Sequence, residues 1–319
     1  MNSHTHPAPV EGMVDCAVTR LNDDLKRSLP LSWPHVEAWI NDITGGAGLC
    51  RYFLHASAFP SLLLPWWLEE TLTTRPDRRL HTDLIGSSIR GYLGIRLIDD
   101  VMDADPRAQV SLLPVTAFFF SGFQSLLARW FPTDPLFWTA FHKHWARAAD
   151  SASDDATAAM IDQARFRQVA AAKVRGALIP MTAVCRLHEL TDVPEPWQLW
   201  FQSLAEWHQL RNDVRDWQRD KARGVPTIVL SDAQRDKHPG QDVTEWMLRE
   251  GALRQHTALA ERLEGLRDQA DVLGSPGARS YLEDRTTEQE RTLAAVKSGT
   301  REINRLYAIH GTALRQVES

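Results

Sequence analysis

The sequence predicts an all-α protein, a single-domain helical bundle around a central cavity, and three observations favour this fold class. Apolar residues recur at three and four positions almost throughout the 319 residues. Alternating β-branched runs, which are typical of strands, are few. No shift in composition marks a linker. Residues 1–13 show no signal-peptide pattern, and we expect a disordered tail there, followed by one α domain over 14–319.

Turn-forming residues divide the chain into ten expected helices. Clusters of glycine, proline and small polar residues lie at 44–46, 75–77, 132–135, 193–196 and 274–277. Between and around them, the periodic pattern predicts helices over 14–29, 34–43, 49–73, 80–104, 108–131, 135–156, 158–190, 196–223, 243–273 and 286–310.

Composition excludes several classes of protein. A net charge of −5 and a pI near 6.2 argue against a nucleic-acid partner, because binding a phosphate backbone requires a dominant basic surface. Three widely spaced cysteines indicate neither a disulfide framework nor a zinc site, so we expect a cytoplasmic location. The longest apolar runs, 59–68 and 112–120, are shorter than the roughly 20 residues of a membrane helix. We therefore expect a soluble protein without a transmembrane segment.

Tryptophan is frequent, at 12 residues. Large rings fill the gaps between long helices, and we expect that role for Trp66, Trp67, Trp197 and Trp200. Other tryptophans could line a pocket, where an aromatic face attracts cations.

A first acidic motif lies within an apolar helical stretch, as Asp99-Asp100-Val101-Met102-Asp103. Asp99 and Asp103 are one helical turn apart on the same face. Like charges at this spacing destabilise an isolated helix, and buried carboxylates require a cationic partner. Mg²⁺ prefers carboxylate oxygens and commonly bridges them to phosphates, so the motif predicts a magnesium site for a diphosphate.

A second acidic motif lies 113 residues further along the chain. Asn212, Asp216 and Asp220 follow at i, i+4 and i+8 and form one oxygen-rich stripe, with Gln209 beside it and Asp213 flanking it. This stripe predicts a second set of metal ligands.

A salt-bridged surface helix is the structural alternative for the second motif, because Arg211, Arg215 and Arg219 have the same spacing. The helix is expected to end at Gly224, which is a favourable residue just past a helix C-terminus. Lys221 and Arg223 in its last turn are placed to help hold phosphate.

Together these residues resemble the class I isoprenoid synthase superfamily. The first motif resembles the aspartate-rich motif of these enzymes, and the segment 209–227 resembles the second motif of trans-prenyltransferases, including Gly224-x-x-Thr227. Asn212 with Asp216 and Asp220 is also similar to the Asn/Ser/Glu metal motif of terpene cyclases. The Asn-x-x-Arg-Asp order resembles the squalene and phytoene synthase branch. The resemblance implies a barrel-like helical fold from about 34 to 307.

The resemblance also implies a function. We expect a magnesium-dependent terpene synthase, with three Mg²⁺ ions, that ionises an allylic prenyl diphosphate and cyclises or rearranges the carbocation. The catalytic residues would be Asp99, Asp100, Asp103, Asn212, Asp216 and Asp220, and Asp213 would join them as a metal ligand. The diphosphate would be held by Arg167, Lys173, Lys221, Arg223, Arg305 and Tyr307.

Two of the diphosphate contacts follow from position. Lys173 lies 40 residues before Asp213, where prenyltransferases place a lysine, and Arg167 falls about where cyclases place a diphosphate-sensing arginine. Gly176 with Pro180 would break that helix. The alternative is a solvated helix face. Arg305 and Tyr307 weakly resemble the Arg-Tyr pair of cyclases, with Leu306 between them.

Departures from the resemblance favour cyclisation over chain elongation. The segment Gly45-Gly46-Ala47-Gly48-Leu49-Cys50-Arg51 lacks the lysine that binds a homoallylic diphosphate, and no Arg-Arg-Gly follows the first motif. A trans-prenyltransferase using isopentenyl diphosphate or another acceptor stays the alternative, with a non-catalytic helical subunit as the second. A ferritin-type di-metal site is excluded because no glutamate has a histidine three residues later. A homodimer, the substrate chain length and the product skeleton are left open.

Overall fold

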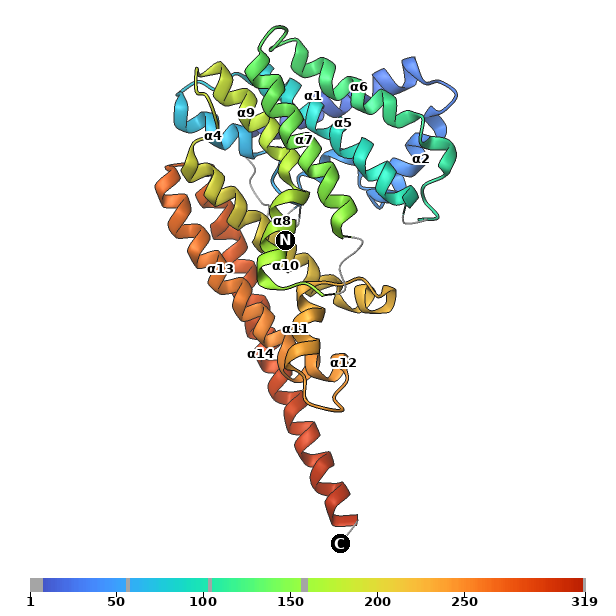
Figure 1. The fold of residues 1–319 in the computed structure, drawn as a ribbon, viewed down its shortest axis with the longest axis vertical. Helices are drawn as coiled ribbons and strands as arrows, with labels where there is room; N and C mark the ends of the chain where they lie inside the picture. Colours follow the sequence, from blue (N-terminus) through green and yellow to red (C-terminus); the bar gives the residue numbers. More distant parts are fainter. Residues whose placement is uncertain (1–7, 56–57, 103–104, 156–159, 318–319) are drawn as a thin grey trace. The chain divides into compact units, whose positions relative to one another are not determined.

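The computed structural model describes residues 8–55, 58–102, 105–155 and 160–317 (Figure 1). These residues form helices joined by turns, with no strand among them, so the all-α prediction is confirmed. The chain divides into two compact units. Unit 1 comprises Met1–His144 and Ala177–Val193, and unit 2 comprises Trp145–Gly176 and Pro194–Ser319. The expected single domain and its central cavity stay predictions.

Unit 1 is built around the long helix α5. Its helices are α1 (Ala8–Ser28), α2 (Trp33–Ile43), α3 (Gly48–Phe53), α4 (Leu64–Leu72), α5 (Arg78–Met102), α6 (Val115–Ala128), the first part of α7 (Pro135–Asp155) and α9 (Leu178–Leu187). Helix α5 packs most closely against α6 and α1. Glycine makes the α5–α6 approach possible, since a Cβ on Gly94 would lie 2.6 Å from the Phe120 ring.

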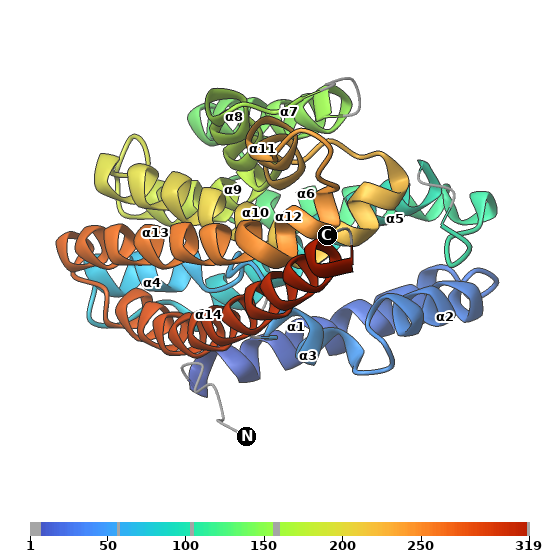
Figure 2. The same cartoon turned by 90° about the horizontal axis from the view of Figure 1, so that it is seen from below.

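Unit 2 is built around α10. Its helices are α8 (Gln163–Lys173), α10 (Glu195–Arg223), α11 (Ile228–Asp236), α12 (Val243–Trp246), a π-helical turn (Met247–Gly251), α13 (Ala252–Leu273) and α14 (Pro276–Val317). Helices α13 and α14 run side by side, and α13 also packs on α10 (Figure 2). Gly274 ends α13 in the left-handed conformation at φ 67°, and Pro276 then begins α14.

Several expected helices are wrong in their bounds. The segment 49–73 is two helices, because α3 ends at Phe53, Pro60 lies between the helices, and α4 begins at Leu64 with Pro65 in its first turn. The segment 158–190 is interrupted by the 3₁₀ turn Arg175–Ala177, at the Gly176 position where the resemblance implies a break. Helix α11 was not expected at all, and α14 begins ten residues before position 286.

The expected disordered tail over residues 1–13 overlaps the start of α1. Residues 1–7 lie outside the described part of the chain, but α1 begins at Ala8. Val10 and Met13 are buried in unit 1, so this segment belongs to the core. The apolar spacing of α1 begins at Val10, within the segment predicted to be a tail.

The tryptophan prediction is confirmed. Trp66, Trp67, Trp197 and Trp200 are all buried, and Trp197 packs edge-on against Trp200 at 5.7 Å between ring centroids. Large rings therefore fill space between helices in both units.

One described segment, Val110–Ala128, is long and apolar enough to cross a membrane by length and composition alone. It is longer than the run 112–120 that the sequence singles out, and about a quarter of it is buried. Its buried side chains are spaced one turn apart along α6 and face the core of unit 1, namely Val115, Phe119, Phe123 and Leu127. A core helix passes the same test, so the expected absence of a transmembrane segment is retained as a prediction.

Gly251 provides a test of packing in unit 2. A Cβ at this position would lie 2.3 Å from the ring of buried Trp246, so Gly251→Ala must displace that ring. We expect the free energy of unfolding to fall by about 1–3 kcal/mol, measured by urea denaturation.

The matched control is Gly265→Ala on α13, where a Cβ would meet nothing within 4 Å. Alanine should stabilise this exposed helix position by about 0.5–1 kcal/mol. Equal effects of the two substitutions would contradict the packing described for Gly251.

Candidate functional site

The first acidic motif lies at the C-terminal end of α5, in unit 1, and its two described aspartates face different surroundings. Asp99 is exposed, whereas Asp100 is buried. Asp103 lies outside the described residues. Adjacent helical positions point about 100° apart, so one carboxylate of this pair faces solvent while the other faces the protein.

Both oxygens of the Asp100 carboxylate are engaged by neighbouring side chains. Arg96, one turn earlier, lies 2.7 Å from Oδ1, and the indole Nε1 of buried Trp39 donates to Oδ2 at 3.1 Å. Asp100 therefore fastens the end of α5 to α2. Loss of Arg96 would leave the buried carboxylate with an unpaired charge, and loss of Trp39 would leave it with an unmade hydrogen bond.

The second motif lies in the last third of α10, in unit 2. Asn212, Asp216 and Asp220 are each half-buried and form the expected stripe along one face of the helix. Arg215 and Arg219 both contact the Asp216 carboxylate at 3.0 Å. This pairing matches the salt-bridged surface helix of the alternative interpretation, and it lowers the pKa of Asp216, first through the hydrogen bonds from Arg215.

Asp213 is buried beneath this stripe. Its Oδ1 accepts a hydrogen bond of 2.7 Å from the side chain of Gln209, one turn earlier. Burial raises the pKa of Asp213 to about 7, although the Gln209 hydrogen bond, the charge of Lys173 and the backbone N–H of Ile228 lower it. The neighbouring Asp220 raises it further, so the two carboxylates and Lys173 share one electrostatic environment.

The segment Gly224-x-x-Thr227 forms the turn from α10 to α11. Gly224 adopts the left-handed conformation at φ 68°, which confirms the expected helix end. The Thr227 hydroxyl accepts from the N–H of Leu230 and caps α11. This cap places the first turn of α11 beside Asp213, since the Ile228 N–H is among the groups that lower its pKa.

Lys173 is the last residue of α8, and its charge acts on both Asp213 and Asp220. The helix breaks immediately afterwards, at the 3₁₀ turn Arg175–Ala177, which confirms the expected break before Pro180. Arg167 lies elsewhere on α8 and pairs with Glu206 of α10 at 3.9 Å. The structure therefore brings Lys173, but not Arg167, to the acidic stripe.

The remaining candidate diphosphate ligands are dispersed over unit 2. Lys221 contacts Asp242 at 3.0 Å and the Thr244 hydroxyl at 2.9 Å. Tyr307 is exposed on α14, and the guanidinium of Arg249 lies 4.9 Å from its ring centroid. Arg223 and Arg305 are exposed, on α10 and α14.

The donor set of the stripe fits a hard divalent cation. Amide and carboxylate oxygens are the ligands that Mg²⁺ prefers, and Asn212, Asp216 and Asp220 provide them from consecutive turns of one helix. Among the described residues, no three side chains of histidine, cysteine, aspartate or glutamate form a ready metal cluster. Asp99 and the stripe belong to different units.

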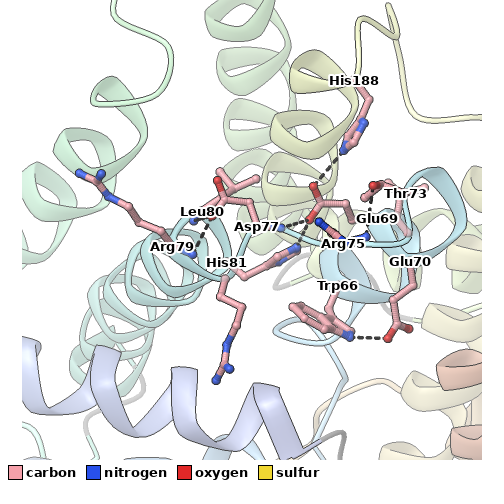
Figure 3. A network of polar contacts seen from close by, with 12 residues as sticks. Trp66, Glu69, Glu70, Thr73, Arg75, Asp77, Arg79, Leu80, His81 and His188 are labelled. Carbon is pink, nitrogen blue, oxygen red and sulfur yellow. Dashed lines mark hydrogen bonds and ion pairs between the residues drawn. The ribbon is translucent and has the colours of Figure 1, made fainter.

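A buried cluster in unit 1 was missed by the sequence argument. Glu69 of α4 is buried and accepts hydrogen bonds from the Nε2 atoms of His81 at 2.5 Å and His188 at 2.9 Å (Figure 3). The His81 ring lies edge-on against Trp66 at 5.0 Å. The search for glutamate and histidine three residues apart could not find this cluster, because its members come from α4, α5 and the end of α9.

Neither a protein-family model nor a curated protein matches this chain.

The Glu69 cluster predicts a specific pH dependence. Burial raises the pKa of Glu69, but the hydrogen bonds from His81 and His188 outweigh it, and the pKa lies below the ordinary 4.5. A lowered carboxyl pKa stabilises the fold above about pH 4.5, and this contribution is lost as pH falls through the folded-state value. Glu69→Gln should reduce the free energy of unfolding at pH 7 by about 1–3 kcal/mol. It should also flatten the loss of stability below pH 4.5, as measured by urea denaturation.

The control is Glu70→Gln on the same helix. Glu70 accepts a hydrogen bond from Trp66, and burial raises its pKa. Ionised Glu70 therefore does not stabilise the fold at pH values above the ordinary carboxyl pKa. We expect this variant to be at least as stable as the wild type at pH 7. If both variants lost the same free energy of unfolding, the hydrogen bonds from His81 and His188 to Glu69 would not be the source of its contribution to stability.

Proposed function

We propose that this chain is a magnesium-dependent class I terpene synthase. It would ionise an allylic prenyl diphosphate, cyclise or rearrange the resulting carbocation and release diphosphate. The observation that carries this proposal is the acidic stripe of α10 with a lysine beside it. Asn212, Asp216 and Asp220 offer oxygens on one face, and Lys173 contributes a positive charge from α8, which packs against α10.

The charge distribution around the stripe suits a metal-bound diphosphate. Bound Mg²⁺ would neutralise the negative charge that develops on the leaving diphosphate. Asn212, Asp216 and Asp220 would provide oxygens for Mg²⁺ on α10, and Asp99 would provide an oxygen for Mg²⁺ on α5. Lys173 would bind a diphosphate oxygen directly, as a point charge. Arg215 and Arg219 would have to release Asp216 when a metal binds, since they occupy its oxygens.

The buried aspartates have a different part in this proposal. Asp100 has both oxygens occupied by Arg96 and Trp39, so it would position Asp99 by fixing the end of α5. Asp213 would support the stripe from below through Gln209 and the first turn of α11.

Metal dependence tests the reaction class. Diphosphate release from geranyl, farnesyl or geranylgeranyl diphosphate should require Mg²⁺, and it should collapse in Asp99→Ala and in Asn212→Ala because both lose a metal-binding oxygen. The measurement is colorimetric detection of released diphosphate, with melting temperatures to confirm folding. Turnover in EDTA at the wild-type rate would refute the proposal.

Lys173 tests the diphosphate contact. Removing a cation that touches the diphosphate in Lys173→Ala should lower kcat/KM by a factor of about ten or more, which corresponds to about 1.4 kcal/mol. The charge-matched control is Lys297→Ala, an exposed lysine on α14. Near-wild-type kinetics in Lys173→Ala would show that this lysine does not contact the diphosphate and belongs to a solvated face of α8.

Product analysis separates cyclisation from prenyl transfer. The loop Gly45–Gly48 lacks a lysine for a second diphosphate, so the carbocation should be captured within the same molecule. Farnesyl diphosphate alone should yield a cyclised or rearranged hydrocarbon or alcohol by gas chromatography and mass spectrometry. A longer prenyl diphosphate that forms only with added isopentenyl diphosphate would favour the alternative assignment, a trans-prenyltransferase.

A further inference from the structure

Unit 1 contains a cavity of about 530 Å³ between α1, α5 and α6. Its wall is unusually rich in charge, because five arginines and three aspartates line it. The α5 residues that face it are spaced at helical intervals and form one face of that helix. The charged members are Arg20, Asp23, Asp24 and Arg27 of α1, Arg79, Asp83 and Arg90 of α5, and Arg129 at the end of α6.

Two glycines on facing helices make room for the deepest arginine. Arg90 is buried, and a Cβ on Gly122 of α6 would lie 2.6 Å from its Cδ. A Cβ on Gly86 of α5 would lie 3.3 Å from its Nη1. The guanidinium is held in place by the Gly86 carbonyl at 3.1 Å and by Asp24 at 2.8 Å. The cavity thus has a fixed, positively charged floor.

The aspartates neutralise only part of this charge. Asp24 pairs with Arg27 as well as with Arg90, and Asp83 is held by Arg20 at 3.4 Å. The second oxygen of Asp83 accepts from the indole of Trp130 at 3.1 Å. The carboxylates of Asp24 and Asp83 are therefore each shared between two donors.

Two arginines at the mouth have no carboxylate partner within the described chain. The guanidinium of Arg79 lies 6.0 Å from the Trp130 ring, and its side chain extends away from the Glu69 cluster (Figure 3). Arg129 is exposed, and its positive charge repels that of Arg90. Burial lowers the pKa of Arg90 and the charge of Arg129 lowers it further, while Asp24 opposes both. Like charges that converge in this way indicate a place for an anion.

We propose that this cavity is a binding site for a small phosphate-class polyanion, such as a diphosphate group, held chiefly by Arg79 and Arg129 above the buried Arg90. Guanidinium groups bind phosphate oxygens through paired hydrogen bonds, and arginines from three helices can approach one anion from several directions. A cavity of this volume is within the range of small-molecule sites.

This site is separate from the acidic motifs. Arg79 and Asp99 both lie on α5, 20 residues apart, which corresponds to about 30 Å along the helix. Binding in the arginine cavity needs no metal ion, whereas binding at the acidic stripe depends on Mg²⁺. The two sites can therefore be distinguished in one protein by the presence or absence of magnesium.

The test is isothermal titration calorimetry of the full chain with inorganic pyrophosphate in EDTA. We expect saturable binding with one site, which weakens at high NaCl as charges are screened. In the double variant Arg79→Gln/Arg129→Gln the dissociation constant should rise at least tenfold. The control is Arg78→Gln, an exposed arginine beside Arg79 that does not line the cavity, and its affinity should equal that of the wild type.

Further titrations identify the anion class. Inorganic phosphate should bind more weakly than pyrophosphate, and succinate should bind more weakly still, because it offers fewer oxygens to each guanidinium. No binding of pyrophosphate without magnesium, or equal losses in the double variant and in Arg78→Gln, would overturn the proposal. Succinate binding more tightly than pyrophosphate would also overturn it. A failure of prenyl diphosphate turnover leaves this result unaffected.

Discussion

Buried carboxylates on helices are the constraint on which both units depend. A carboxylate inside an all-α fold cannot be satisfied by its own helix backbone, so a partner must come from a neighbouring helix. Asp100 fastens α5 to α2 through Trp39, and Glu69 joins α4 to two histidines from other elements. In unit 2, Asp232 of α11 accepts from Gln255 of α13 at 2.9 Å. Each buried acid therefore selects one arrangement of helices, because losing its partner would leave a buried charge or an unmade hydrogen bond.

The same constraint creates two kinds of residue within each acidic motif. In each motif one aspartate is buried and hydrogen-bonded, whereas the other described candidate ligands are less buried, with Asp99 exposed and Asn212, Asp216 and Asp220 half-buried. Asp100 has its hydrogen bonds from Arg96 and Trp39, and Asp213 has one from Gln209. The outward residues keep oxygens on the surface of the helix, and the buried ones fix the direction in which that surface points. The acidic residues of one motif look equivalent in the sequence, but in the structure the buried and the outward-facing ones have different roles.

Helix α5 has three regions with different roles along its length. Its first turns contribute arginines to a positively charged cavity, its middle is packed against α6 through Gly94, and its last turns present Asp99. Glycine is used where a backbone or a buried side chain must approach closely, as at Gly122 beside Arg90. A single rigid helix can keep these regions apart because each residue advances the chain by about 1.5 Å.

The sequence by itself determined the helical class, the burial of tryptophans such as Trp200, the helix end at Gly224 and the break after Lys173. These features depend on local periodicity and on residues with restricted or permissive backbones, which act over a few positions. It did not determine the interruption between α3 and α4, although Pro60 signals it, because a long apolar run masked the break. Tertiary structure alone decided which aspartates are buried, since adjacent residues on a helix differ only in the direction they face. It also decided the clusters at Glu69 and around the arginine cavity, because their members lie far apart in the chain and meet only when the helices pack.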